Sequence, residues 1–173
     1  MPTILREHRL HLKAAGERAY IFDIASQIAR LCGTLVPHLR HAGYARLSPK
    51  RHREPLEKVI RLLFDAQDRR PMFHVEGTEL PLCWNSPRDW DKDYVKYEWG
   101  HLLSRNQNAP DSQPLQNLGL YSARCNQHIQ ASLDVQELMV YGGIIALRVS
   151  LVLTKRRLLF ASPEWKAALS ELS

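Results

Sequence analysis

The hydrophobic pattern of this chain changes along its length, and this change restricts the fold it can adopt. Residues 17–32 carry apolar side chains at intervals of three and four, which predicts an amphipathic helix that stops at Gly33. The same period over residues 53–67 predicts a second helix. Residues 72–121 instead hold short apolar and aromatic runs separated by Gly, Pro and Asn, which indicates strands and loops. Such a chain is limited to a mixed α and β architecture.

Helical patterns frame the strand-like middle region on both sides. Strands are expected over residues 94–99 and 118–121, with a short helix at 124–133. A helical pattern returns over 135–153, and a Ser-Pro-Glu run opens a last helix at 162–172. The sequence therefore predicts an α+β fold with a strand-strand-helix unit between N-terminal and C-terminal helices.

Charge is distributed unevenly along the chain. The 173 residues carry a net charge of +6, which divides into +7 over residues 1–70, −3 over 71–135 and +2 over 136–173. These limits separate a basic helical region, a strand-rich region and the C-terminal helices, which at this length we expect to form one compact domain. The excess of positive charge favours an anionic partner, nucleic acid before a membrane surface.

Cysteine usage and the apolar runs indicate a reduced, cytoplasmic protein. Cys32, Cys83 and Cys125 form no Cys-x-x-Cys pair, so neither a disulfide framework nor a zinc knuckle is predicted. The N-terminal residues are charged almost at once and lack the apolar stretch of a signal peptide. The longest apolar run, residues 139–147, falls short of the ~20 residues that a membrane span requires.

Polar residues at the ends of the predicted strands have the chemistry of a phosphodiester hydrolase. A neutral histidine at a strand end can deprotonate water near neutral pH, which is the role open to His101. Asn126 on the following helix can bind Mg²⁺, which typically takes one or two protein oxygens and keeps several waters. Asn117 can order the loop between them. The alternative is that all three are ordinary structural, turn and cap residues.

Residues 117–126 and the run Glu98-Trp99-Gly100-His101 resemble the His-Me finger nucleases, also called ββα-metal or HNH-type nucleases. In that family an Asn precedes an apolar strand and a second Asn follows nine residues later. The run at 98–101 is similar to the Asp-Arg-Gly-His motif of the non-specific nuclease branch. The resemblance covers about residues 94–135 and implies a ββα-metal finger with Mg²⁺ as cofactor, for which Mn²⁺ can substitute.

The resemblance also implies a role for each residue of the site. The histidine is the general base, one asparagine orders the loop and the other coordinates the metal, while acids nearby support its water shell. An acid eight residues beyond the metal-binding asparagine is part of this pattern. Catalytic roles then fall to His101, Asn117, Glu98 and Asp134. Metal contacts fall to Asn126 and to His128, for which a helix-surface position is the alternative.

Several positions depart from the family pattern. Trp99 replaces the arginine of the motif, so a phosphate-contacting cation must come from elsewhere. The candidates are Arg105, Arg124 and His128. Gly100 cannot supply the second metal ligand that other members carry directly before the histidine. Ser122 and Cys125 stand where many members have a Cys-x-x-Cys pair, so we expect no structural zinc.

These features predict a Mg²⁺-dependent endonuclease of the restriction type that hydrolyses double-stranded DNA. A homodimer is expected because its two-fold axis matches the symmetry of the duplex, and the apolar helix at 135–153 is either its interface or part of the core. Contacts to DNA should come from basic side chains, although the basic turn at 48–53 can equally be a solvated linker. The predicted contacts are Lys50, Arg51, Arg53, Arg105, Arg124, Lys155, Arg156 and Arg157.

Two other functions fit the same sequence. One is a non-catalytic nucleic-acid-binding protein in which the strands and helix are structural. The other is a non-specific nuclease of the same superfamily that cleaves DNA or RNA, since this chemistry does not intrinsically exclude a 2′-hydroxyl.

Overall fold

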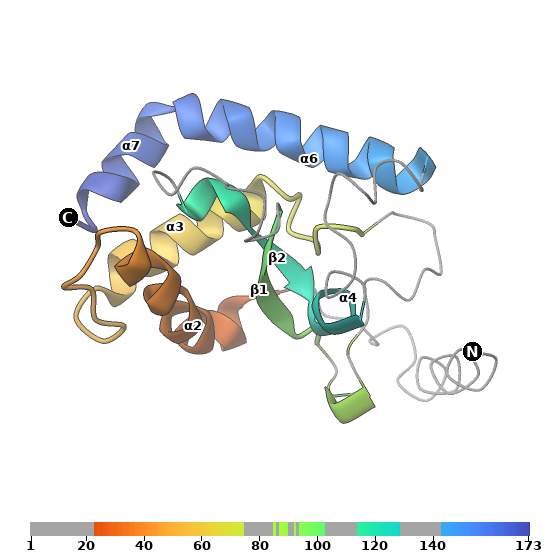
Figure 1. Ribbon diagram of the computed structural model, residues 1–173, viewed down its shortest axis with the longest axis horizontal. Helices are drawn as coiled ribbons and strands as arrows, with labels where there is room; N and C mark the ends of the chain where they lie inside the picture. Colours follow the sequence, from red (N-terminus) through yellow and green to blue (C-terminus); the bar gives the residue numbers. More distant parts are fainter. Residues whose placement is uncertain are drawn as a thin grey trace.

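A two-stranded antiparallel sheet lies between helices in the centre of the molecule (Figure 1). The computed structural model describes residues 23–74, 85, 87–89, 92, 94–102, 114–128 and 143–173. Among these residues, two α-helices precede the two strands and three α-helices follow them, and the strands form one antiparallel sheet, which confirms the predicted α+β class.

The helices and strands occupy the following positions. The α-helices are α2 (Ile28–His41), α3 (Arg53–Asp65), α4 (Ala123–His128), α6 (Gly143–Ala161) and α7 (Pro163–Ser170). The strands are β1 (Tyr97–His101) and β2 (Leu118–Ser122). Short 3₁₀-helices are η2 (Ala25–Gln27), η4 (Pro87–Asp89) and η6 (Pro114–Asn117).

Helix α2 does not stop at Gly33, so this part of the prediction is wrong. The helix continues to His41 and contains both Gly33 and Pro37. Its buried face continues past the glycine, because Leu31, Leu35 and Leu39 follow one another at intervals of four and are fully buried. Burial of each leucine contributes roughly 1.5–3 kcal/mol, which exceeds the cost of about 1 kcal/mol for glycine inside a helix.

Helices α6 and α7 form the C-terminal arm of the fold (Figure 1). α6 continues beyond the predicted end at residue 153, because the basic run at 155–157 is helical and the helix ends at Ala161. The start of α7 is as predicted, since the side chain of Ser162 accepts a hydrogen bond of 3.1 Å from the backbone N–H of Trp165. No described helix, α6 included, is long and apolar enough to cross a membrane.

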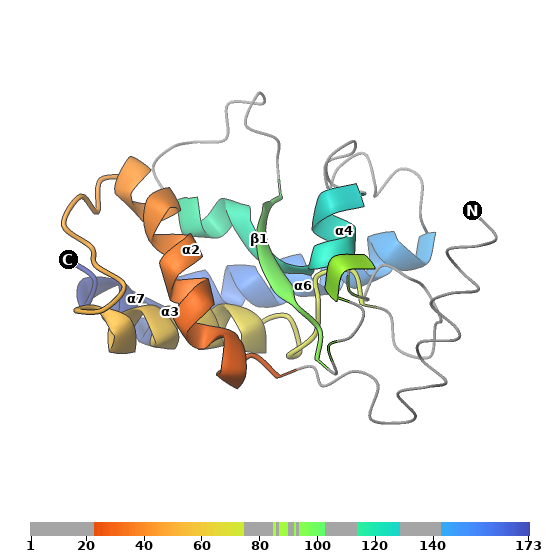
Figure 2. The same cartoon turned by 90° about the horizontal axis from the view of Figure 1, so that it is seen from below.

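The hairpin of β1 and β2 separates two cores. Tyr97, Trp99 and Leu120 point to one face and pack with buried residues of α2, α3 and α7. Tyr121 points to the other face and packs with Cys125 of α4 and with buried residues of α6. Because successive side chains of a strand point to opposite faces, each position on the hairpin belongs to one side. Figures 1 and 2 show α2 and α4 on opposite sides of β1.

Two buried glutamines cover the outer edges of the hairpin. On β1, Gln27 donates to the carbonyl of Val95 (2.7 Å) and accepts from the N–H of Tyr97 (3.0 Å). On β2, Gln67 donates to the carbonyl of Leu120 (2.8 Å) and accepts from its N–H (3.0 Å). Each carboxamide thus pairs with the backbone as a further strand would. Backbone groups that would otherwise be buried without partners are satisfied in this way.

An ion-pair cluster joins α6 to the turn that follows α3. Asp68 has a left-handed backbone (φ 59°) and its carboxylate contacts both Lys155 and Arg148, the latter at 2.8 Å. Burial pushes the pKa of Asp68 up, but the hydrogen bonds and charges of Lys155 and Arg148 outweigh it and hold the pKa below its ordinary value. The turn and α6 are therefore held together by charge as well as by packing.

Replacing Gln67 by methionine tests the role of the glutamine edge. Gln67→Met keeps the shape of the side chain but leaves the buried N–H of Leu120 without an acceptor. We expect the free energy of unfolding to fall by about 2 kcal/mol, as measured by urea denaturation. The exposed Gln116→Met is the matched control and should change it by less than about 0.5 kcal/mol. Equal stabilities of the two variants would contradict this role.

Replacing Asp68 by asparagine tests the charge cluster, because asparagine also tolerates a left-handed backbone. At pH 7, Asp68→Asn should lower the free energy of unfolding by about 1 kcal/mol, a modest value because the carboxylate is 44% exposed. A lowered folded-state pKa means that this stabilisation is complete above the unfolded pKa of about 3.9 and is lost as the pH falls through the folded value. Denaturation curves between pH 7 and pH 3 should therefore converge for wild type and variant.

The matched control for this pair is Asp65→Asn, which removes an exposed ion pair with Arg69 in the same region. We expect a change of less than about 0.5 kcal/mol. A difference between wild type and Asp68→Asn that persisted unchanged at the lowest pH would rule out the charge explanation.

Candidate functional site

Glu98 and Asn126, two of the predicted site residues, lie together on the α4 face of the hairpin. Asn126 Nδ2 donates to one carboxylate oxygen of Glu98 at 3.0 Å, and Gln127 Nε2 donates to the other at 2.8 Å. Asn126 is half-buried and Gln127 is exposed. β1 and the start of α4 therefore present a carboxylate and an amide to the same point on the surface.

The short helix α4 is directed back toward β1 by a capping hydrogen bond. Ser122, the last residue of β2, accepts a hydrogen bond of 3.2 Å from the backbone N–H of Cys125. Both side chains are buried. The two positions at which many His-Me finger nucleases carry a cysteine pair are thus joined here by an N-terminal cap.

His101 lies on the other face of the hairpin from Glu98 and Asn126. The register pairs His101 with Leu118 without interruption, so its side chain projects to the side of Tyr97 and Trp99. There its ring contacts His38 of α2, with ring centroids 5.4 Å apart and planes at 66°. The structure therefore does not bring the predicted base together with the predicted metal ligand.

Asn117 lies at the His101 end of the hairpin. It is the last residue of η6, and its carbonyl accepts a hydrogen bond of 2.8 Å from the N–H of Leu102, the residue after His101. Through its backbone, Asn117 joins the start of β2 to the end of β1.

Arg30 of α2 is a neighbour of Glu98 that the sequence did not reveal. Its Nη2 donates to the carbonyl of Tyr97 (2.7 Å) and to the side chain of Gln27 (2.6 Å). Burial lowers the pKa of Arg30, and the negative charge of Glu98 opposes that shift. No local pattern could have found this residue, because it is 67 positions from Tyr97 in the sequence.

The oxygens of Glu98 and Asn126 suit a hard cation such as Mg²⁺ by their chemistry. Within the described residues, Asn126 makes its hydrogen bond through Nδ2, so its Oδ1 has no protein donor there. No group of three or more His, Cys, Asp or Glu side chains in the described part of the chain is placed to hold a metal ion. A cation at this point would therefore depend on two protein oxygens and on water.

Among the predicted DNA contacts, Arg124 lies closest to this pair in sequence and is on the same helix. It is half-buried, and burial lowers its pKa. No carboxylate of the described residues pairs with it. Since no described carboxylate neutralises it, Arg124 is available to an anionic ligand.

The remaining basic candidates are spread over the molecule. Lys50, Arg51 and Arg53 are exposed in and after the linker between α2 and α3. Figures 1 and 2 show this linker near one end of the long axis, on the other side of the hairpin from α4. On α6, Lys155 is paired with Asp68, whereas Arg157 is exposed.

Arg156 was predicted to contact DNA, and the structure contradicts this. Its side chain is 1% exposed, and its Nη2 donates to the carbonyls of Leu115 (3.1 Å) and Leu118. The guanidinium lies 5.2 Å from the centroid of the Phe160 ring. All three residues of the basic run at 155–157 were expected to contact DNA, but adjacent residues of a helix point to different faces, and Arg156 is on the inner one.

Three predicted residues cannot be placed in the site. Arg105 and Asp134 lie outside the described residues. His128 ends α4, but its side chain is also outside the described part of the structure.

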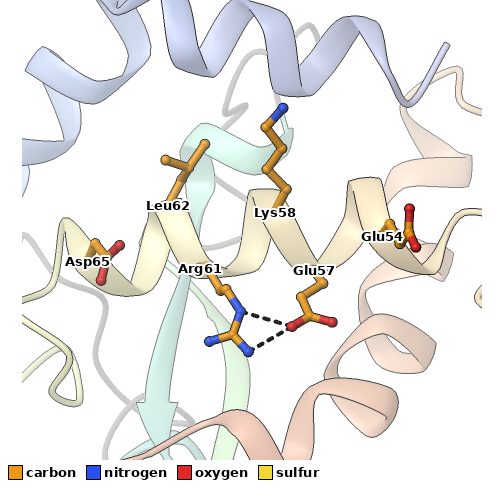
Figure 3. Close-up of a pocket in the computed structure, with 6 residues that line it drawn as sticks. All are labelled: Glu54, Glu57, Lys58, Arg61, Leu62 and Asp65. Atoms are coloured by element: carbon orange, nitrogen blue, oxygen red, sulfur yellow. Dashed lines mark hydrogen bonds and ion pairs between the residues drawn. The ribbon is translucent and has the colours of Figure 1, made fainter.

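A surface hollow of about 350 Å³ lies on α3 and contains none of the predicted site residues. Figure 3 shows that its charged side chains come from successive turns of the helix, with Arg61 bound to Glu57 at 2.7 and 2.9 Å. The hollow is lined by Glu54, Glu57, Lys58, Arg61, Leu62 and Asp65. Its charges are of both signs and give it no selectivity for an anion.

Comparison with known protein families, curated proteins and solved structures found no similar protein. No protein-family model matches the chain, and neither a curated protein nor a solved structure is significantly similar to it.

Proposed function

We propose that this protein is a Mg²⁺-dependent endonuclease of the ββα type that acts on double-stranded DNA. The observation that supports the proposal is the order β1–β2–α4, in which the helix sets Asn126 against Glu98 while His101 ends the first strand. The same order of elements and residues carries the resemblance to His-Me finger nucleases. A restriction-type enzyme acting as a homodimer is the form we expect, because two copies cut two strands most simply.

The proposed chemistry divides between two groups of residues. Glu98 and Asn126 would hold the cation, which when bound stabilises charge on the phosphate and on the leaving oxygen. His101 accepts the proton of the attacking water, and Asn117 fixes the strand end from which His101 projects. Arg124 contacts a phosphate next to the scissile one.

The contact of His101 with His38 sets a condition on this mechanism. In the structure the imidazole faces α2, away from Asn126. Catalysis therefore requires the end of β1 to turn His101 toward α4 when DNA is bound. His101 is the last residue of the strand, so such a turn breaks one strand pair rather than the whole hairpin.

A non-catalytic nucleic-acid-binding protein is the second candidate, and this separation of His101 from Asn126 favours it. In that case Glu98 simply ties α4 to β1 through Asn126 and Gln127, and the basic side chains alone contact phosphate. Both functions predict that the protein binds DNA, but only the endonuclease should cleave it.

Plasmid nicking separates the two functions. The wild type should nick supercoiled DNA with Mg²⁺ or Mn²⁺ and stop with EDTA. His101→Ala should lower the rate at least about 100-fold, because a general base typically contributes 10²–10⁴-fold, while DNA binding is retained. Asn126→Ala should also reduce cleavage and should raise the Mg²⁺ concentration needed for half-maximal rate.

The exposed His41→Ala on α2 is the matched control and should cleave as the wild type does. If the wild type binds DNA but cleaves neither DNA nor RNA with either metal, the endonuclease proposal is wrong and the non-catalytic nucleic-acid-binding protein is the function that remains. Sequencing the ends made on a long DNA then distinguishes restriction-type cleavage, with unique ends, from non-specific cleavage, with scattered ends.

Substitution of Arg124 tests the phosphate contact without depending on catalysis. Arg124→Met should weaken binding of a fluorescent duplex and reduce the slope of log affinity against log salt by about one unit. Arg61→Met on α3 is the matched control, because Arg61 is already paired with Glu57. An unchanged slope in Arg124→Met, or an equal change in both variants, would show that Arg124 does not contact a DNA phosphate.

A further inference from the structure

Arg156 bonds the turn that precedes β2 from within the core. Its Nη2 lies within hydrogen-bond distance of the carbonyls of Leu115 (3.1 Å), Gln116 (3.4 Å) and Leu118. These carbonyls come from the residues on both sides of Asn117. One guanidinium from α6 therefore sets the path of the backbone through η6 and into β2.

The position of Arg156 is unusual for a charged side chain. It is 1% exposed, and among the described residues its Nε and Nη1 have no hydrogen-bond partner and no carboxylate pairs with it. Burial lowers its pKa to about 10. An apolar side chain would fill this space beside Phe160 without the cost of burying a charge. A role in fixing the turn, rather than in packing, explains why a cation is present here.

The turn held by Arg156 is also the partner of the His101 strand end. The carbonyl of Asn117 accepts from the N–H of Leu102, and Leu118 is the register partner of His101. At this end of the hairpin, β1 is thus aligned by backbone groups whose neighbours are bonded to Arg156.

We propose that Arg156 is a positioning residue that fixes the η6–β2 turn and, through Asn117 and Leu118, the place of His101 at the end of β1. α6 thereby acts on the candidate site through the η6–β2 turn. The catalytic consequence rests on the proposed function, whereas the structural coupling does not.

Amide hydrogen exchange tests the coupling without requiring activity. Two amides report on the two ends of the hairpin, because Leu102 N–H bonds Asn117 at one end and Ala123 N–H bonds Lys96 at the other. In Arg156→Met we expect Leu102 to exchange at least about 10-fold faster while Ala123 changes much less. Arg157→Met, one residue along the same helix and exposed, is the matched control and should alter neither amide.

Each outcome decides the proposal. Equal acceleration at Leu102 and Ala123 would show that Arg156 supports the fold as a whole, and no acceleration would show that it does not hold the turn; either result overturns the proposal. If Arg156→Met does not fold, Arg156→Lys decides by the same two amides, since an ammonium keeps the charge but cannot reproduce the guanidinium geometry.

Cleavage assays add the catalytic consequence. In an active enzyme, Arg156→Lys should lower kcat with little change in KM, because the substrate-binding surface is untouched while the η6–β2 turn, on which the end of β1 pivots to bring His101 toward α4, is loosened. A wild type without cleavage would remove the proposed function, and the exchange experiment would still test the role of Arg156.

Discussion

The pairing of two glutamine side chains with the backbone of the hairpin is the interaction on which the rest of the structure depends. An isolated two-stranded sheet is marginally stable in water, and its outer backbone groups need partners once they are buried. Gln27 supplies them for β1 and Gln67 for β2, each through one carboxamide that both donates and accepts. Because Gln27 precedes α2 and Gln67 follows α3, these bonds also fix both helices against the sheet.

This arrangement divides the hairpin into two faces with different neighbours. α2 and α3 cover one face with a large apolar core, so the other face is left to α4 and α6. The strand period then assigns Glu98 to the side of α4 and His101 to the side of α2. The separation of the two groups is a consequence of the period of the strand, and a nuclease mechanism has to change the strand end to overcome it.

Local patterns in the sequence predicted the helices and strands. Long-range contacts determine where a helix such as α2 ends and which of its side chains bond to distant segments. The strands, α3 and the Ser162 cap follow from periodicity and from capping residues within a few positions. The path of α2 through Gly33 depends on burial against distant segments. Arg30 bonds a carbonyl 67 positions away, and Arg156 bonds carbonyls 38 to 41 positions away. Their roles could therefore not be predicted from neighbouring residues in the sequence.

The same contacts change the meaning of the net charge of +6. Several cations serve the fold itself: Arg148 and Lys155 bind Asp68, and Arg156 binds backbone carbonyls. An exposed basic group remains in the linker before α3, on the other side of the hairpin from α4, the helix that carries Arg124. A duplex that contacts both must therefore run along the long axis of the molecule. A duplex that crosses this axis at α4 would contact Arg124 but not the linker.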